Sequence, residues 1–210
     1  MSGSLGRREL LGSVVAGLFV GGIGGRSVTA PPRSPHRDGR GEPVPDDRAT
    51  PVAEEETPYA VYQYRPGIGG GFVPTLPVNV VFPLETAVLS DVVGVLQQAT
   101  WYERPAEYPR YAYDRDAASW CRSDWSGAEM VTGAAGRLHV RCWGLAGTAS
   151  LQVHVDSPPS PHHRIRSHSA GRRAVERLFS ATGWTVAGNP VDLGNDQPPD
   201  HDGTASVITR

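Results

Sequence analysis

The chain has no lysine, only two cysteines and no apolar run long enough to span a bilayer. All 20 of its basic residues are arginines, a preference typical of a GC-rich prokaryotic genome rather than of a chemical need for guanidinium groups. The formal net charge is −2 over 210 residues, and a weakly acidic chain lacks the concentrated basic surface that phosphate backbones require. Composition therefore argues against a nucleic-acid partner, and the length has room for one domain with tails.

The motifs of common hydrolases and nucleotide-binding proteins are also missing. Neither a G-x-S-x-G elbow nor an H-E-x-x-H pair occurs in the chain. The segment PGIGGG at residues 66–71 lacks the lysine and the Ser/Thr of a phosphate-binding loop, and it does not stand between a strand and a helix. We interpret it as a turn, and the sequence predicts no cofactor.

Residues 1–30 have the pattern of a twin-arginine signal segment. Arg7 and Arg8 precede two leucines and a glycine-rich apolar stretch that ends near Ile23, too short for a stable membrane span. Val28 and Ala30 supply the small residues of a cleavage site. We therefore expect export by the twin-arginine machinery to an extracellular or cell-surface location. An uncleaved N-terminus is the alternative, and it would be the only contact with a membrane.

The remainder of the chain divides into a linker and a folded domain. Residues 31–58 are rich in Pro, Asp, Glu and Arg with almost no large apolar side chain, which predicts a disordered linker. Residues 59–210 form the predicted domain. Because export permits disulfides, Cys121 and Cys142 are most simply a pair. Such a bond would close a loop of about 22 residues and contribute roughly 3 kcal/mol.

Two similar strand-and-helix units indicate the fold class. An apolar run at 78–82 precedes a helical stripe that ends near Trp101, and a second apolar run at 151–155 precedes a helix that ends near Trp184. The second helix has an apolar face around Val175 and Phe179 and arginines on its other face. These units predict an α+β two-layer sandwich, with two helices on one face of a mainly antiparallel sheet.

The clearest hairpin joins the strand RLHVRCW, residues 137–143, to a strand that begins at Ser150. Alternation places the apolar side chains of both strands on one face, which must meet the helices. If the register is symmetrical about the loop, Arg137 faces Asp156, His139 faces His154 and Arg141 faces Gln152. The candidate ligand-binding residues are these six polar side chains of the other face: Arg137, His139, Arg141, Gln152, His154 and Asp156.

Two imidazoles opposite one another could hold a metal ion or act as an acid–base pair. His162, His163 and His168 follow in the next loop, so the candidate metal ligands are His139, His154, His162 and His163, with His168 as a further one. The alternative is a solvent-facing polar sheet surface made of cross-strand pairs. We interpret Asp200, His201 and Asp202 as turn residues.

A connection rich in aromatic residues carries the carboxylates of Asp114, Asp116 and Asp124. Aromatic faces with carboxylates bind sugars, and paired carboxylates cleave glycosides. The alternative is that the aromatic side chains pack over an edge of the core.

The order of these parts resembles the C-terminal domain of LssY-type proteins. The similarity rests on PVNVVF with a following helix that ends in a tryptophan, then RLHVRCW, LQVHVD, a histidine-containing loop and a helix that reaches SATGW. It covers about residues 77–187. This family domain is often attached to a membrane phosphatase of the lipid-phosphate type, which has no counterpart here, so the resemblance implies no phosphatase activity. It implies that a ligand would lie at Arg137, His139, Arg141 and His154.

We therefore expect an exported accessory or ligand-binding domain at the cell envelope. One alternative is a small secreted hydrolase that uses His139 and His154, or else the carboxylates at 114, 116 and 124. Such an enzyme should gather these groups in a concave pocket. The other alternative is a metal-binding protein, which requires at least three of the histidines to converge.

Overall fold

The computed structural model describes residues 43–44, 57–84, 87, 89–99, 101–104, 108–129, 136–158 and 164–210. Several predictions fall outside these residues. They are the signal segment 1–30 with Arg7 and Arg8, almost all of the linker 31–58, and His162 and His163.

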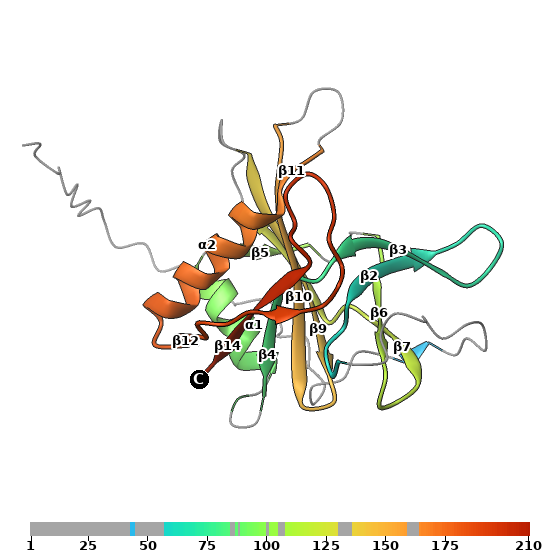
Figure 1. Ribbon diagram of the computed structural model, residues 1–210, viewed down its shortest axis with the longest axis horizontal. Coiled ribbons are helices and arrows are strands. Elements are labelled where there is room, and N and C mark those ends of the chain that lie inside the picture. The colour runs from blue at the N-terminus through green and yellow to red at the C-terminus, as the bar shows by residue number, and fades with distance from the viewer. Residues whose placement is uncertain are drawn as a thin grey trace, which may run out of the picture. The chain divides into compact units, whose positions relative to one another are not determined.

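A large sheet of nine strands organises the described residues (Figure 1). Its two longest strands are β9 (Arg137–Leu145) and β10 (Thr148–Asp156), which form the predicted hairpin. The order is β12-β14-β4-β10-β9-β8-β5, with β11 beside β10 and β13 beside β14. All pairings are antiparallel except that of β14 with β4. The other strands are β4 (Val80–Pro83), β5 (Trp101–Glu103), β8 (Trp125–Glu129), β11 (Ile165–Ser167), β12 (Thr185–Val186), β13 (Val191–Asp192) and β14 (Thr204–Thr209).

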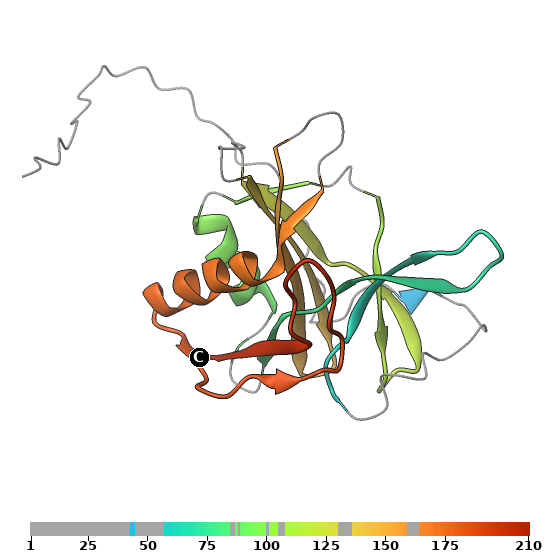
Figure 2. The same cartoon turned by 45° about the horizontal axis from the view of Figure 1, so that its top comes forward.

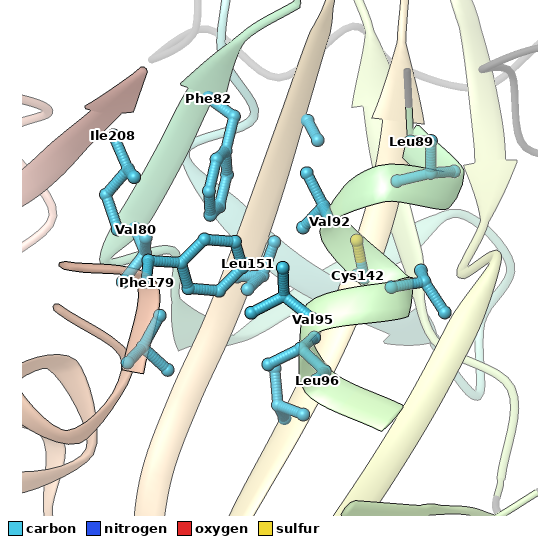
Figure 3. Packing of buried hydrophobic residues seen from close by; sticks show 14 of the residues in the cluster. Val80, Phe82, Leu89, Val92, Val95, Leu96, Cys142, Leu151, Phe179 and Ile208 are labelled. Carbon is cyan, nitrogen blue, oxygen red and sulfur yellow. The ribbon is translucent and has the colours of Figure 1, made fainter. Parts of the chain in front are cut away.

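Both helices, α1 (Leu89–Gln98) and α2 (His168–Ala181), pack on the same face of this sheet. The apolar stripe of α1 meets the inward side chains of β9 and β10, while Phe179 of α2 packs against Phe82 at 4.8 Å between ring centres (Figure 3). These contacts confirm the predicted α+β sandwich with two helices on one face of a mainly antiparallel sheet. No helix among the described residues is long and apolar enough to cross a membrane.

The sequence did not predict a second, smaller sheet, which lies on the other side of β9 and β10 (Figure 2). Trp143 and Val81 of the large sheet form a core with Ala112 and Cys121 of the small one. Short strands separated by turns give little periodicity, so this sheet left no clear sequence signal. Its strands are β1 (Pro43–Val44), β7 (Ser119–Arg122), β6 (Tyr111–Asp114), β2 (Tyr62–Pro66) and β3 (Phe72–Pro77).

The two cysteines lie in different cores, so the predicted disulfide is wrong. Cys142 points from β9 toward the helices, whereas its neighbour Trp143 points toward the small sheet and shares a core with Cys121. Because successive side chains of a strand project to opposite faces, the large sheet separates the two sulfur atoms. Neither cysteine is in a disulfide and both are buried, and burial raises the pKa of the Cys142 thiol well above its usual value.

Helix α2 begins close against β10, and a glycine makes this approach possible. A Cβ at Gly171 would lie 2.8 Å from the Cα of His154, a separation that real Cβ atoms essentially never show. The Ser167 side chain caps the helix by accepting a hydrogen bond from the Ala170 N–H at 2.9 Å. The first turn of α2, including His168, therefore lies at the edge of β10 beside His154.

Candidate metal centre

The register of the hairpin is the one that the sequence predicts. Arg137 pairs with Asp156, His139 with His154 and Arg141 with Gln152. Arg137 and Asp156 also form an ion pair, with a nitrogen-to-oxygen distance of 3.6 Å. The symmetrical register assumed for the hairpin therefore holds, and it brings the two histidines opposite one another.

The polar face of the hairpin is buried, so the alternative of a solvent-facing surface is wrong. Relative exposure is 8% for His139, 4% for His154 and 6% for Asp156, and Gln152 has none. Arg141 donates a hydrogen bond at 2.9 Å to the carbonyl of Tyr108, which lies just before strand β6 of the small sheet. This face thus lies inside the protein because a layer absent from the prediction covers it.

His139, His154 and Asp156 form a cluster of potential metal ligands. One ligand atom from each lies within 4.8 Å of the others, and all three residues are buried. The rings of His139 and His154 have centres 5.1 Å apart and planes at 75°. The Nε2 of His154 lies 3.0 Å from an Asp156 carboxylate oxygen. Two nitrogens and one carboxylate oxygen therefore converge from two adjacent strands.

The amide of Gln152 holds the other nitrogen of the His154 ring. The Nδ1 of His154 lies 3.0 Å from the Gln152 nitrogen and 3.2 Å from its oxygen. The amide can thus donate to Nδ1 or accept from it, depending on which tautomer the ring adopts. When Nδ1 carries the proton, Nε2 is left with a lone pair directed to the side where Asp156 lies.

Two further histidines from other parts of the chain extend the buried pair His139 and His154 into a row of four. The ring of His168, at the start of α2, lies 6.3 Å from that of His154, and the ring of His201 lies 5.8 Å from that of His168. The Nε2 of His201 is hydrogen-bonded to the Asn195 side-chain oxygen at 2.8 Å. Of the predicted loop histidines, the structure therefore places His168 beside the pair. It also places there His201, which was interpreted as a turn residue.

The His168 side chain is fully buried without an adequate polar partner. Its exposure is 0%, and neither ring nitrogen has a hydrogen-bond partner of ordinary geometry. Burial, followed by the neighbouring His154 and His201, lowers the pKa of His168 to about 4, although Asp200 and the Pro198 carbonyl act in the opposite direction. The ring is therefore neutral over the physiological pH range, which leaves a lone pair on one nitrogen.

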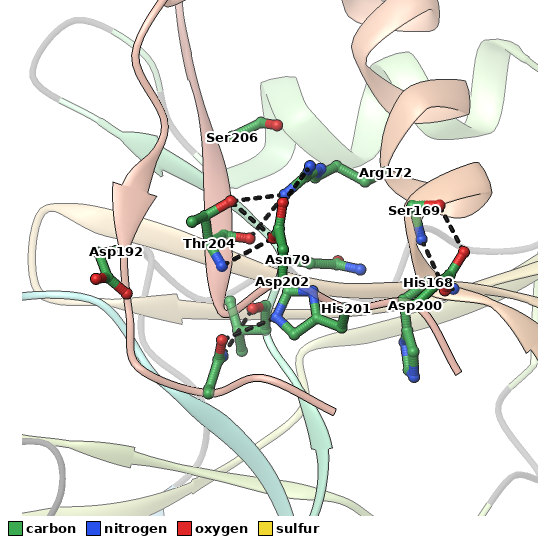
Figure 4. Close-up of polar contacts among 12 residues, drawn as sticks. Asn79, His168, Ser169, Arg172, Asp192, Asp200, His201, Asp202, Thr204 and Ser206 are labelled. Carbon is green, nitrogen blue, oxygen red and sulfur yellow. Dashed lines mark hydrogen bonds and ion pairs between the residues drawn. The ribbon is translucent and has the colours of Figure 1, made fainter. Parts of the chain in front are cut away.

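The aspartates near the C-terminus fasten α2 in place rather than joining the cluster (Figure 4). Asp200 accepts hydrogen bonds from the His168 N–H at 2.7 Å and from the Ser167 hydroxyl at 2.6 Å. Desolvation would raise the pKa of Asp200, but these bonds to the helix N-terminus outweigh it and lower the pKa to about 2. Asp202 pairs with Arg172 of α2 at 3.1 Å. These turn residues thereby fix the position of His168.

The carboxylates of the aromatic segment have separate structural partners. Asp114 accepts a hydrogen bond from the Ala117 N–H within a turn, and Asp116 is exposed. Asp124 accepts the Gly144 N–H at 2.7 Å, and burial raises its pKa to about 6. The aromatic side chains pack on one another, with Trp120 against Tyr64, Phe72 and Tyr113. This is the packing alternative of the sequence analysis.

A cavity of about 420 Å³ lies on the opposite side of the hairpin from the histidines. Leu138 and Val155, on the helix-facing side of β9 and β10, line it together with Ala170, Ala174 and Arg177 of α2. His139, His154 and Asp156 are not among its described lining residues. This cavity therefore lies across the sheet from the histidine cluster.

Sequence reasoning named His139 and His154 as metal ligands, with His168 as a further one, and Asp156 as a ligand-binding residue; it did not find His201. A loop and β11 separate His168 from the hairpin, and α2, β12 and β13 also lie between the hairpin and His201. No periodic signal relates positions so far apart; the packing of α2 on β10 places His168. No protein-family model, no curated protein and no solved structure matches this chain.

Proposed function

We propose that this domain is an exported accessory module of the cell envelope that binds one divalent transition-metal ion between His139, His154 and Asp156. The observation that carries the proposal is the convergence of three buried ligand atoms within 4.8 Å of one another. Buried polar groups of this kind are usually paired for stability or arranged to coordinate an ion.

The spacing of the two imidazole rings supports coordination of one ion by both. When a ring nitrogen binds zinc at about 2.0–2.1 Å, the ring centre lies about 3.2 Å from the ion. Two rings on a tetrahedral ion then have centres about 5.2 Å apart. The centres of His139 and His154 are 5.1 Å apart. The spacing of the two ring centres therefore fits two imidazoles on one tetrahedral ion.

The donor set selects a class of metal. Two imidazole nitrogens and one carboxylate oxygen suit Zn²⁺, Co²⁺, Ni²⁺ or Fe²⁺, whereas Ca²⁺ and Mg²⁺ prefer sites made only of oxygen. A ligand nitrogen must be free of its proton, so an ion would take the place of the hydrogen bond between His154 Nε2 and Asp156, whose atoms are 3.0 Å apart.

The residues around the three ligands resemble the supporting shell of known metal sites. Ligating histidines usually donate their other ring N–H to an oxygen, which fixes the tautomer. The oxygen of Gln152 lies 3.2 Å from His154 Nδ1 and can accept that proton. Arg137 holds the second oxygen of Asp156 at 3.6 Å, leaving the first oxygen for the ion. Gln152 and Arg137 would therefore orient a ligand each.

The hydrolase alternative has less support. His139 and His154 are buried, and the described cavity lies across the sheet from them. The three aspartates at 114, 116 and 124 have separate partners or face solvent. The described cavity therefore does not gather these groups, as a hydrolase pocket should.

Elemental analysis by mass spectrometry of the purified, dialysed chain tests the proposal. After incubation with zinc, the unaltered protein should retain about one ion per chain, and a His139→Ala, His154→Ala double variant should retain almost none. Asp114→Asn is the control, because it removes a buried carboxylate of the small sheet. Equal metal content in the double variant and the unaltered protein, or none in either, would overturn the proposal.

A further inference from the structure

We infer that His168 is a fourth ligand of this ion, so that the ion is enclosed by three nitrogens and one oxygen and joins α2 to β9 and β10. The inference rests on the proposed function. It adds a residue from another element, and it makes the site a closed, zinc-type centre rather than an open one with a free coordination position.

The first support is the state of the His168 side chain. A fully buried imidazole with neither nitrogen in an ordinary hydrogen bond is rare, because burying an unpaired polar group costs free energy. Each such group in a folded protein calls for an explanation, and an ion that binds there supplies one. The ring nitrogens of His154 and His201 have hydrogen-bond partners without an ion. His154 is held by Gln152 and Asp156, and His201 by Asn195.

The second support is distance. Two imidazoles on opposite sides of one ion can have ring centres at most about 6.4 Å apart, and two at a tetrahedral angle about 5.2 Å apart. The centres of His154 and His168 are separated by 6.3 Å. His168 is outside the group whose ligand atoms all lie within 4.8 Å. A movement of about 1 Å, within reach of a side-chain rotation, therefore brings its ring to tetrahedral spacing.

The third support is that the backbone of His168 is held against the site. Asp200 accepts its N–H at 2.7 Å, and Gly171, one turn later, packs against the His154 backbone. The backbone position of His168 is thus set by contacts that do not involve its imidazole, which leaves the imidazole nitrogens for a ligand role.

Replacing the ion with Co²⁺ in the full chain tests the inference, because the visible spectrum of cobalt reports coordination number and exchangeable ligands. The unaltered protein should show the intense bands of a tetrahedral site, unchanged by azide. His168→Ala should still bind cobalt, about tenfold or more weakly, and azide should now shift its spectrum. His201→Ala is the matched control and should behave as the unaltered protein does.

Two further results keep the inference separate from the proposal on which it rests. If the unaltered protein binds no cobalt, the metal site itself is wrong. If it binds cobalt and azide shifts its spectrum as much as that of His168→Ala, the metal site stands and His168 is not a ligand. His168→Phe, which fills the same buried space without a nitrogen, replaces His168→Ala if circular dichroism shows that the alanine variant is unfolded.

Discussion

His139 and His154 face each other across β9 and β10, with ring centres 5.1 Å apart, inside the protein rather than on its surface. The same alternating sequence pattern is compatible with a pair on the protein surface and with a pair inside the protein. In a two-layer protein it would be a polar surface, whereas here a second sheet and the C-terminal segment enclose it. Burial turns a cross-strand pair into a site whose polar atoms must find partners.

Metal binding should stabilise the fold. At a free zinc concentration about a hundredfold above the dissociation constant, linkage adds about 2.7 kcal/mol, which corresponds to a rise in Tm of about 5–10 °C for a domain of this size. Differential scanning fluorimetry with and without zinc measures the rise. The same rise in the His139→Ala, His154→Ala variant would show that the ion binds elsewhere.

Gly171→Ala should destabilise the protein by about 1–3 kcal/mol, because the added methyl group would overlap the His154 backbone and push α2 away from β10. Gly94→Ala in α1 is a matched control, since a Cβ there meets nothing within 4 Å, and it should stabilise by about 0.4–1 kcal/mol. Urea unfolding measures both. Similar changes in the two variants would contradict the close packing of α2.

The stability of the metal-free protein should fall as the pH drops from about 6.5 toward 4. The pKa of His168 is lowered to about 4 in the folded state from 6.5, so the unfolded chain binds a proton that the folded chain excludes. This group therefore contributes stability above pH 6.5 that is lost as the pH falls, with a slope of at most about 1.4 kcal/mol per pH unit.

His168→Phe should flatten this part of the profile, because it removes the titrating group. Urea unfolding at a series of pH values gives the slope for each protein. His201, whose pKa is also lowered by burial, contributes in the same direction, so some slope should remain. A profile that is equally steep in the variant would show that His168 does not cause it.

Reducing agent should leave the Tm of the protein unchanged, because Cys121 and Cys142 form no disulfide and lie in different cores. A thiol reagent should label neither cysteine in the folded state and both in denaturant, since both are buried. Cys142→Ser should cost about 1–3 kcal/mol by placing a hydroxyl among apolar side chains. A mass lower than that of the reduced chain by two hydrogen atoms would instead reveal a disulfide.

Much of the fold could be predicted from periodicity. The stripe of α1 and the apolar face of α2 recur at helical spacing, and the strands 137–145 and 148–156 alternate with period two. The pairing of His139 with His154 followed because the loop between the strands is short and the register symmetrical. Helix and strand periodicity depends on residues a few positions apart, so it can be recognised in the sequence alone.

The small sheet, the separation of the cysteines and the burial of the polar face had no such local cause. Cys121 and Cys142 are close in sequence, yet the large sheet separates them because Cys142 and Trp143 project to opposite faces. A pairing argument from spacing alone contains no information about which face each side chain takes. The disulfide prediction failed for that reason.

The sequence by itself determined the helices, the hairpin, its register and therefore the two opposed histidines. Only the tertiary structure decided that they are buried, that Asp156 completes a cluster with them, and that His168 and His201 extend the row. The physical reason is the separation along the chain of the residues that interact. Hydrogen-bonded register and side-chain alternation are set by neighbours along the chain, whereas a buried site needs segments that meet only when helix α2 and the segment 195–201 pack against the finished hairpin.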